Sequence, residues 1–277
     1  MLIAIDGSES SLHAFKESMK LADTEKSWIT AVCVTPPYEG DLEVMGIGDI
    51  REAMSRPCLD TIEKATAIAD AQNRHVKFIH ENGRFHERII DVAEEYNCEL
   101  IVMGRHGHHG LSRTLIGSVA TRVIGFSQRD VLIVPKESAI GWGNVLVATD
   151  GSEFSERAVD RAIDFTASYE GKLNVVSAVD VPVEAYGEAP EAIDRMVEKA
   201  REIVDTAVNK AKAAGIMAEG HVRTGDSAEI ILELAEKLSA ETIFMSSLGK
   251  TGLTRLLLGS VAEKVIGLSH CPVLIAK

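Results

Sequence analysis

Glycines at a fixed spacing are the residues of this chain whose pattern points most directly to chemistry. Gly104 and Gly107 are followed, after nine residues, by Gly117 and Ser118. An apolar segment, Leu100–Met103, precedes them, and a helix-like segment follows. Glycine lets the main chain approach a ligand without a Cβ atom, and the N–H groups at a helix start attract anions. The pattern predicts a phosphate-binding loop in the first half of the chain.

The second half of the chain repeats this loop. Ser246 and Gly249 are followed, after nine residues, by Gly259 and Ser260. The nine residues that begin at the third motif position read GSVATRVIG in the first half and GSVAEKVIG in the second. No lysine follows the glycines as in G-K-[ST], so neither loop is a P-loop. The duplication argues against plain turn glycines that match by chance.

An aspartate accompanies each loop, directly after an apolar strand-like segment. The sequence Asp6-Gly7-Ser8-Glu9 returns as Asp150-Gly151-Ser152-Glu153. These carboxylates are suited to capping the following helix and to contacting a ligand, and the two roles are compatible. The repeats imply two units of about 140 residues, a common domain size. We predict one domain over 1–136 and a second over 144–277, joined by a linker.

Both halves alternate apolar strand-like segments with helix-like segments. Strands that are apolar throughout are typical of a parallel sheet covered on both faces, and right-handed crossovers then give a doubly wound α/β sandwich. Ligands bind at the carboxyl ends of such strands where the winding reverses. If the first and fourth strands are neighbours, the aspartate and the glycine loop face one crevice. The predicted strands are Met1–Ile5, Trp28–Val34, Val76–His80, Leu100–Met103, Val131–Val134, Asn144–Ala148, Leu173–Val179, Met217–Val222, Thr242–Met245 and Val273–Ala276.

Charge and composition exclude several classes of protein. The net charge of −13 repels a polyphosphate backbone, so we expect no nucleic-acid partner. No apolar run approaches the roughly 18 residues that span a bilayer, and no signal peptide is expected, because the N-terminus enters a strand at once. The four cysteines are scattered, and Cys33 and Cys271 are expected to pack as small hydrophobes. This usage predicts a reduced, cytoplasmic protein.

The loops and their aspartates are similar to the nucleotide-binding branch of the universal stress protein family, which carries G-x2-G-x9-G-[S/T] after strand four and an aspartate after strand one. The match covers nearly the whole of both halves, so the chain resembles a tandem universal stress protein. The resemblance implies an adenine nucleotide α-hydrolase-like fold of two doubly wound sandwiches, each with a five-stranded parallel sheet of order 3-2-1-4-5. It implies ATP, ADP or AMP as ligand, commonly with a divalent ion such as Mg²⁺. It also implies an intramolecular pseudo-dimer, with a homodimer as the alternative.

The resemblance assigns roles to individual residues of the first half. It places the Asp6 carboxylate near the ribose and base, and the backbone of Val34 at the adenine edge. The adenosine and ribose contacts fall on Ala4, Ile5, Asp6, Val34, Met103 and Gly104, and the phosphate cradle falls on Gly107, Gly117, Ser118 and Val119.

The second half matches with one departure. Ser246 stands where the family has its first glycine, and Leu248 replaces a histidine that the first half keeps as His106. Nucleotide binding is therefore predicted mainly in the first half. Weak binding, another nucleotide and a vestigial site all remain open for the second. The matching residues are Ala148, Thr149, Asp150, Val179, Met245, Ser246, Gly249, Gly259, Ser260 and Val261.

Three functions compete on this pattern. A phosphate cradle without an evident catalytic base favours a stress-response regulator in which bound nucleotide sets conformation or partners. An ATPase, at most a slow one, needs a base or a water-positioning group, for which the loop offers His106, His108 and His109. A scaffold that works through protein contacts is the third. The same histidines form no recognised metal-ligand spacing, so a solvated polar loop is favoured over a metal site.

Overall fold

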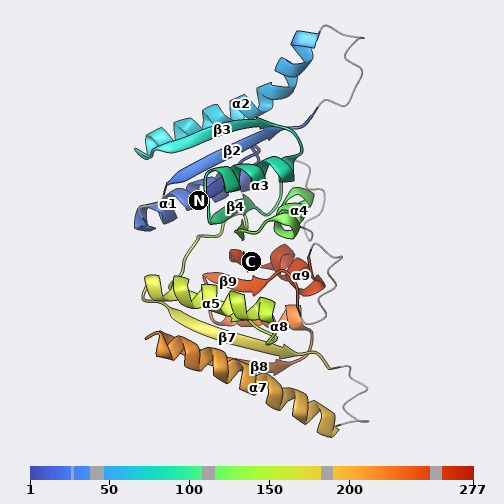
Figure 1. The fold of residues 1–277 in the computed structure, drawn as a ribbon. Coiled ribbons are helices and arrows are strands. Elements are labelled where there is room, and N and C mark those ends of the chain that lie inside the picture. Colours follow the sequence, from blue (N-terminus) through green and yellow to red (C-terminus); the bar gives the residue numbers. More distant parts are fainter. Residues whose placement is uncertain (26–27, 38–46, 108–115, 182–189, 250–257) are drawn as a thin grey trace. The chain divides into compact units, whose positions relative to one another are not determined.

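The computed structural model describes residues 1–25, 28–37, 47–107, 116–181, 190–249 and 258–277. It divides into two compact units, Met1–Glu137 (unit one) and Ser138–Lys277 (unit two). Each unit is a parallel sheet with helices on both faces (Figure 1). In the part of the chain that the structure describes, every helix is too short or too polar to cross a bilayer.

The sheet of unit one has the order β3-β2-β1-β4-β5, and its pairs are parallel. Ala4 of β1 pairs with Val32 of β2 on one side and with Met103 of β4 on the other. The winding therefore reverses between β1 and β4, as the sequence predicted. The elements are β1 (Leu2–Ala4), α1 (Glu9–Glu25), β2 (Ile29–Thr35), α2 (Ile47–Ala71), β3 (Val76–Asn82), α3 (Phe85–Glu95), β4 (Leu100–Gly104), α4 (Ser118–Phe126) and β5 (Asp130–Val134).

Unit two repeats this topology as β8-β7-β6-β9-β10, again with parallel pairs. The doubly wound α/β class and the strand order are thus confirmed in both units. The elements are β6 (Asn144–Ala148), α5 (Glu153–Ser168), β7 (Lys172–Val179), α7 (Pro190–Ala213), β8 (Met217–Thr224), α8 (Ser227–Lys237), β9 (Thr242–Ser246), α9 (Ser260–Leu268) and β10 (Val273–Ala276).

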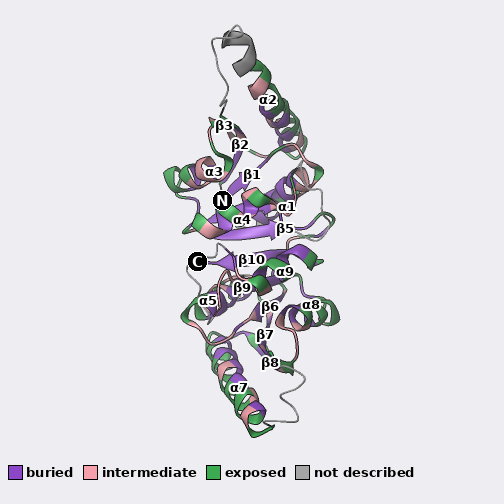
Figure 2. Cartoon of the chain, turned by 90° about the vertical axis from the view of Figure 1, so that its right-hand side faces the viewer, coloured by how far each residue is buried: buried purple, intermediate pink, exposed green. Residues whose placement is uncertain are grey.

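The core of each unit lies between its sheet and the helix layers. Strands β1, β4 and β5 are buried along nearly their whole length, and Figure 2 shows β1 and β5 in the buried colour among helices that carry exposed residues. Helix α1 contacts α2, and α3 contacts α4. This two-sided cover explains why these strands are apolar throughout.

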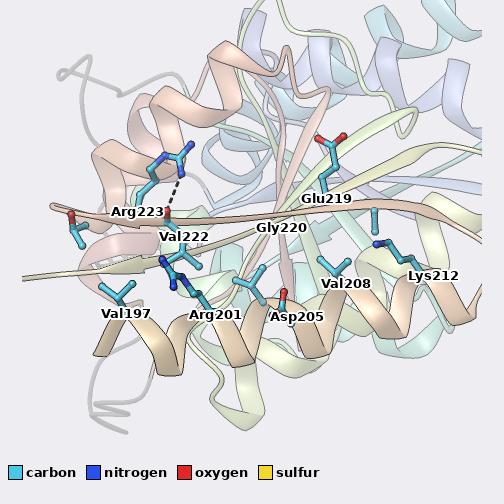
Figure 3. Close-up of a pocket in the computed structure, with 12 residues that line it drawn as sticks. Val197, Arg201, Asp205, Val208, Lys212, Glu219, Gly220, Val222 and Arg223 are labelled. Atoms are coloured by element: carbon cyan, nitrogen blue, oxygen red, sulfur yellow. Dashed lines mark hydrogen bonds between the residues drawn. The ribbon is translucent and has the colours of Figure 1, made fainter. Parts of the chain in front are cut away.

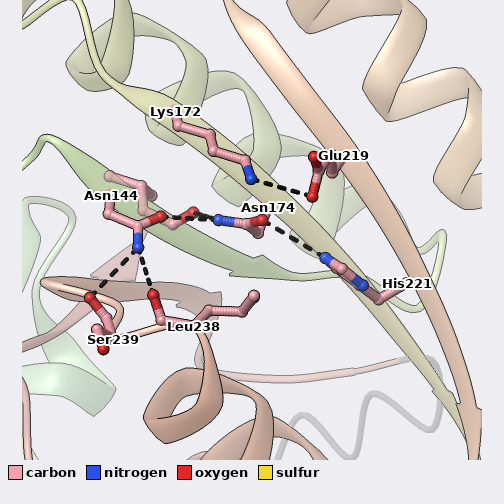
Figure 4. Close-up of polar contacts among 8 residues, drawn as sticks. Asn144, Lys172, Asn174, Glu219, His221, Leu238 and Ser239 are labelled. Carbon is pink, nitrogen blue, oxygen red and sulfur yellow. Dashed lines mark hydrogen bonds and ion pairs between the residues drawn. The ribbon is translucent and has the colours of Figure 1, made fainter.

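A polar network crosses the sheet of unit two (Figure 4). Asn174 is fully buried on β7, and its Nδ2 donates to Asn144 Oδ1 at 2.9 Å. Its Oδ1 lies 3.4 Å from His221 Nε2 on β8. Asn144 Nδ2 in turn donates to the carbonyl oxygen of Leu238 at 2.6 Å. These contacts satisfy an amide whose burial without partners would cost about 1–3 kcal/mol.

The cysteines depart from the prediction of scattered, reduced thiols. Cys33 on β2 and Cys58 on α2 form a disulfide, and both are buried. The sequence did not reveal this pair, because it depends on α2 folding back over β2. Cys98 and Cys271 are buried free thiols, and burial raises the pKa of Cys271. Cys33 and Cys271 are both buried in the core as expected, but Cys33 is bonded to Cys58 and is not a reduced thiol.

Candidate functional site

The turn after β1 presents Asp6. The Ser8 N–H donates to Asp6 Oδ1 at 3.0 Å, and the Ser11 N–H donates to Ser8 Oγ at 3.2 Å. Ser8 therefore caps α1, while Asp6 holds the turn that leads into it. The capping role considered for Asp6 therefore belongs to Ser8, and the bond from the Ser8 N–H uses one of the two Asp6 carboxylate oxygens.

The other oxygen of Asp6 faces the glycine loop. A methyl group placed on Gly107 would lie 2.5 Å from Asp6 Oδ2, so a side chain here would displace the carboxylate from its present position. The Ser8 hydroxyl donates to the carbonyl oxygen of His106 at 3.5 Å. The two motifs, about 100 residues apart in sequence, thus meet at the carboxyl ends of β1 and β4.

The glycine loop is anchored at both ends of its described part. The Arg105 N–H donates to the carbonyl oxygen of Val134 on β5, and the Gly117 N–H donates to the carbonyl oxygen of Arg105, both at 3.1 Å. These bonds bring the start of α4 beside the end of β4. His108 and His109 lie outside the described residues, so the histidine loop is represented by His106 alone.

Helix α4 begins at a glycine. Gly117 is its N-cap, with no side-chain hydrogen bond at the cap, whereas Ser152 caps α5 and Asp226 caps α8 through side-chain oxygens. The first N–H groups of a helix have no partner within it. A glycine cap leaves them open to an incoming anion, which the helix dipole also favours. Ser118 is exposed there and Val119 is half-buried.

Unit two builds the same loop. The Ser152 N–H donates to Asp150 Oδ1 at 3.0 Å, and a methyl group on Gly249 would lie 2.9 Å from Asp150 Oδ2. The Gly259 N–H donates to the carbonyl oxygen of Ser247 at 2.8 Å. Gly259 is the N-cap of α9 without a side-chain cap, and Ser260 and Val261 are exposed and half-buried like their counterparts.

The first motif position differs between the units for a packing reason. A methyl group on Gly104 would lie 2.7 Å from the carbonyl carbon of Ser10, so α1 sits directly on this glycine. In unit two Ser246 occupies the position, and its hydroxyl donates to the carbonyl oxygen of Leu248 at 2.6 Å. The Cβ direction of Gly104 points toward α1. The serine is therefore accommodated without blocking the end of β9.

The two predicted adenine-reading residues, Val34 and Val179, do not occupy corresponding positions in the two units. The Ile5 N–H donates to the carbonyl oxygen of Val32 at 2.9 Å, so the peptide groups of Val32 point toward β1. Val34 lies two residues further along β2, so its peptide groups point to the same side, just beyond the end of β1. In unit two Val176 O accepts from Thr149 N at 2.9 Å. Val34 therefore corresponds to Ala178.

The assignment of Val179 as the partner of Val34 is wrong. Val179 corresponds to Thr35, because Gly225 N donates to Val179 O just as Gly83 N donates to Thr35 O. Its peptide groups thus point toward β8, away from the glycine loop. A one-residue shift reverses the direction of a strand's peptide groups, and the sequence alone did not fix this register.

The remaining predicted residues lie beneath the turn and loop. Ala4, Ile5 and Met103 are 8%, 3% and 6% exposed. They form an apolar floor at the ends of β1 and β4. Met245 has the same position on β9 and is 5% exposed.

In the described part of unit one, Arg105 lies in the glycine loop and Lys136 follows β5. Lys136 Nζ lies 2.6 Å from Glu9 Oε2, and the bond lowers the pKa of Glu9 and raises the pKa of Lys136. Both side chains are exposed, so the pair adds little stability. Arg105 is half-buried, and burial lowers the pKa of its guanidinium. Ser247 takes its place in unit two.

A groove of about 620 Å³ in unit two is separate from these residues (Figure 3). It lies between α7 and the edge strand β8, with Val204 and Val208 along α7. Val204 packs where Gly220 has no side chain. Phe78 stands at the matching register in unit one, so the groove belongs to unit two. None of its lining residues is a predicted site residue.

The two units therefore define a duplicated doubly wound α/β fold, and each unit has a glycine loop at its switch point. A model of the Universal stress protein family matches residues 1–135 and 141–277. The chain belongs to the universal stress protein family, as a tandem pair of its domains.

Two sequence relatives each match about half of the chain. Universal stress protein MJ0531 of Methanocaldococcus jannaschii is 35% identical over 137 residues, which cover 48% of this chain and 81% of that protein. Universal stress protein YxiE of Bacillus subtilis is 30% identical over 150 residues, which cover 49% of this chain and 99% of that protein. A solved universal stress protein from Archaeoglobus fulgidus matches 100% of this chain and 95% of its own, with a TM-score of 0.75 and 25% identity.

Proposed function

We propose that the chain is a stress-response regulator that binds ATP or a related adenine nucleotide, mainly in unit one. The observation that carries the proposal is the meeting of Asp6 with Gly107 beside the glycine cap of α4. This arrangement offers a carboxylate acceptor for ribose hydroxyls next to backbone donors for phosphates. The shape suits a nucleoside phosphate better than a free anion.

In this proposal, residues at the end of β2 contact the base of the nucleotide. The peptide groups of Val34 lie one step beyond the ladder with β1 and supply a donor and an acceptor for an adenine edge. Ala4, Ile5 and Met103 provide the apolar floor. A Mg²⁺ ion would be held mainly by the phosphates and water, with Asp6 as the carboxylate in reach.

Unit two keeps the phosphate side of this arrangement. Asp150, Gly249 and Gly259 reproduce the contacts of unit one, and Ser246 turns its hydroxyl onto its own loop. Unit two has Ser247 in place of Arg105 and Ala178 in place of Val34. We propose a second, weaker nucleotide site there.

Isothermal titration of the whole chain with ATP, ADP, AMP and cyclic AMP, each with and without Mg²⁺, tests the proposal. We expect one tighter and one weaker site. Mass spectrometry of protein purified without added ligand should find a carried-over adenine nucleotide. No binding heat up to millimolar nucleotide would reject the proposal and favour the scaffold.

Turnover of ATP in the same samples separates a regulator from an enzyme. We expect less than about one cycle per minute, far below the typical kcat of about 10 per second. Faster hydrolysis that is lost on His106→Ala would favour the ATPase. A matched His270→Ala change, at an exposed position outside the site, is the control.

A further inference from the structure

The disulfide of unit one lies next to the proposed adenine-reading residue. Cys33 directly precedes Val34 on β2, and its partner Cys58 lies on α2. The two half-cystines are 4% and 5% exposed. The bond therefore ties β2 to its covering helix, one residue before the peptide groups that face the nucleotide.

Polar residues accompany the bond on this face of β2. Side chains two residues apart on a strand share a face, so Thr35 lies on the same side as Cys33. Thr35 Oγ1 lies 2.8 Å from His80 Nε2, and His80 is the register partner of Cys33. The face covered by α2 thus carries a sulfur bridge and a polar pair.

Unit two has an aliphatic cluster in this place. By register, Cys33 corresponds to Ser177, Thr35 to Val179 and His80 to Val222. Counted back from the matched helix ends, Cys58 corresponds to Ala200. Val179, Val181, Ile193 and Ala200 form a buried cluster there, with Val197 and Val222 packed against it. Packing alone is thus sufficient to hold this helix on its strand.

We propose that Cys33 and Cys58 form a reversible thiol–disulfide site that sets the adenine-nucleotide affinity of unit one, with the oxidised form binding more tightly. The inference rests on the proposed function. The bond fixes β2 against α2 and so holds the Val34 peptide groups in their binding position, which lowers the cost of ordering them. In the cytoplasmic setting that the sequence predicted, disulfides are usually transient and redox-sensing.

The chemistry is ordinary thiol–disulfide exchange. The thiolate of a small dithiol attacks one sulfur of the bridge, the S–S bond breaks, and the other cysteine leaves as a thiolate that takes up a proton. The second thiol of the reductant then attacks the mixed disulfide and releases the second cysteine. The bridge gains two electrons and two protons, and the dithiol is oxidised to a disulfide. Both sulfurs are buried, so the exchange requires β2 and α2 to separate locally. Bound nucleotide stabilises their bonded arrangement in this proposal and should therefore slow the exchange.

The test compares oxidised and dithiothreitol-reduced chain by titration with ATP and Mg²⁺. A Gly259→Val background removes the heat of unit two. Alkylation under denaturing conditions should count two modified cysteines, Cys98 and Cys271, in the oxidised form and four in the reduced form. We expect reduction to weaken unit-one binding by roughly fivefold or more, the usual scale of a coupling between sites. ATP should slow the appearance of the two additional thiols.

Two variants serve as controls. Cys33→Ser with Cys58→Ala copies unit two, and it should bind like the reduced form whatever the reductant. Cys98→Ala with Cys271→Ala should keep the redox response. Four alkylated cysteines in protein purified without reductant, or equal affinities in the two forms, would overturn this inference alone. No nucleotide heat in either form would overturn the proposed function and this inference with it.

Discussion

The two units agree closely on one side of the proposed nucleotide and differ on the other. At the glycine loops, Asp6 meets Gly107 as Asp150 meets Gly249, and both following helices begin at an uncapped glycine. Next to β2, a disulfide and a Thr35–His80 pair stand where β7 has an aliphatic cluster. The duplication has preserved the proposed phosphate side and changed the surroundings of the proposed base side.

This difference shows which features a phosphate cradle requires. A backbone cradle needs glycines at the two places where a carboxylate or a helix start comes close, and both units keep them. The face of β2 or β7 beneath the covering helix only has to be filled, and sulfur, polar or aliphatic groups all fill it. We therefore expect the two units to share phosphate recognition and to differ in affinity and in response to redox conditions.

The largest expected effect comes from obstructing the proposed phosphate-binding loop of one unit with a side chain. Gly117 has a negative φ, and a methyl group there would lie 3.5 Å from the nearest atom, an ordinary contact. Gly117→Val should therefore leave the fold intact while placing its methyl groups over the donors of α4. We expect unit-one binding to disappear in calorimetry, with an unchanged circular dichroism spectrum.

The matched change in unit two is Gly259→Val. It should remove the weaker site and leave the tighter one. If Gly117→Val keeps full ATP affinity, the site is not at this loop. If each variant weakens both sites equally, the two units do not bind independently.

The next largest effect should come from the carboxylates. Asp6→Ala removes the group that faces Gly107, and we expect the unit-one affinity to fall by about 1–3 kcal/mol, the usual scale for contacts with a charged group. Asp150→Ala should have a similar effect on the weaker site. Both are measured by titration with ATP and Mg²⁺. Unchanged affinity in Asp6→Ala would remove Asp6 from the binding site.

The sequence was sufficient to predict the sheet and the loop. Strands that are apolar throughout and alternate with helices predicted the parallel sheets, and the spacing of Gly107 and Gly117 after β4 placed the loop correctly beside Asp6. These features follow from local pattern and from the handedness of crossovers. They do not depend on how side chains pack.

What the sequence did not reveal depends on register and on the third dimension. The counterpart of Val34 differs by one residue from the predicted Val179, because an apolar strand offers no alternation that fixes its register. The Cys33–Cys58 bond joins a strand to the helix that crosses over it. The sequence predicted that Gly104 lets the main chain approach a ligand, but in the structure the space for its Cβ atom is filled by Ser10 of α1.

Exchanging the first motif residue between the units tests whether α1 is what requires a glycine at position 104. Gly104→Ser should push against the backbone of Ser10 and lower the stability of unit one by about 1–3 kcal/mol, as overpacking usually does. Ser246→Gly removes one hydrogen bond, to Leu248 O, and should cost about 1 kcal/mol or less.

Hydrogen exchange measured peptide by peptide assigns each loss to its unit. Nucleotide affinity of unit two should not rise in Ser246→Gly, since the serine side chain turns onto its own loop. A clear gain in affinity would mean that Ser246 obstructs the second site. A Gly104→Ser protein with unchanged stability would mean that α1 is free to move away from β4.

The smallest expected effect is a difference between the two units in the pH dependence of their stability. Burial first, and then the neighbouring Arg223, lower the pKa of His221 below its usual 6.5, while Glu219 opposes the shift. Below pH 6.5 the unfolded chain therefore binds more protons at this residue than the folded chain does. The stability that neutral His221 contributes is present above that pH and is lost as the pH falls through the lowered value. At the corresponding position unit one has Ile79, which does not titrate.

Urea unfolding at pH 7.5, 6.5 and 5.5, followed by hydrogen exchange in each unit, measures this difference. Unit two should lose stability across the series, and His221→Gln, which keeps a donor for Asn174, should make its pH dependence shallower. His270→Gln, at an exposed position in the same unit, is the matched control. An unchanged slope in His221→Gln would show that Asn174 and His221 separate in solution. The described polar network would then join only β6 and β7, through Asn144 and Asn174.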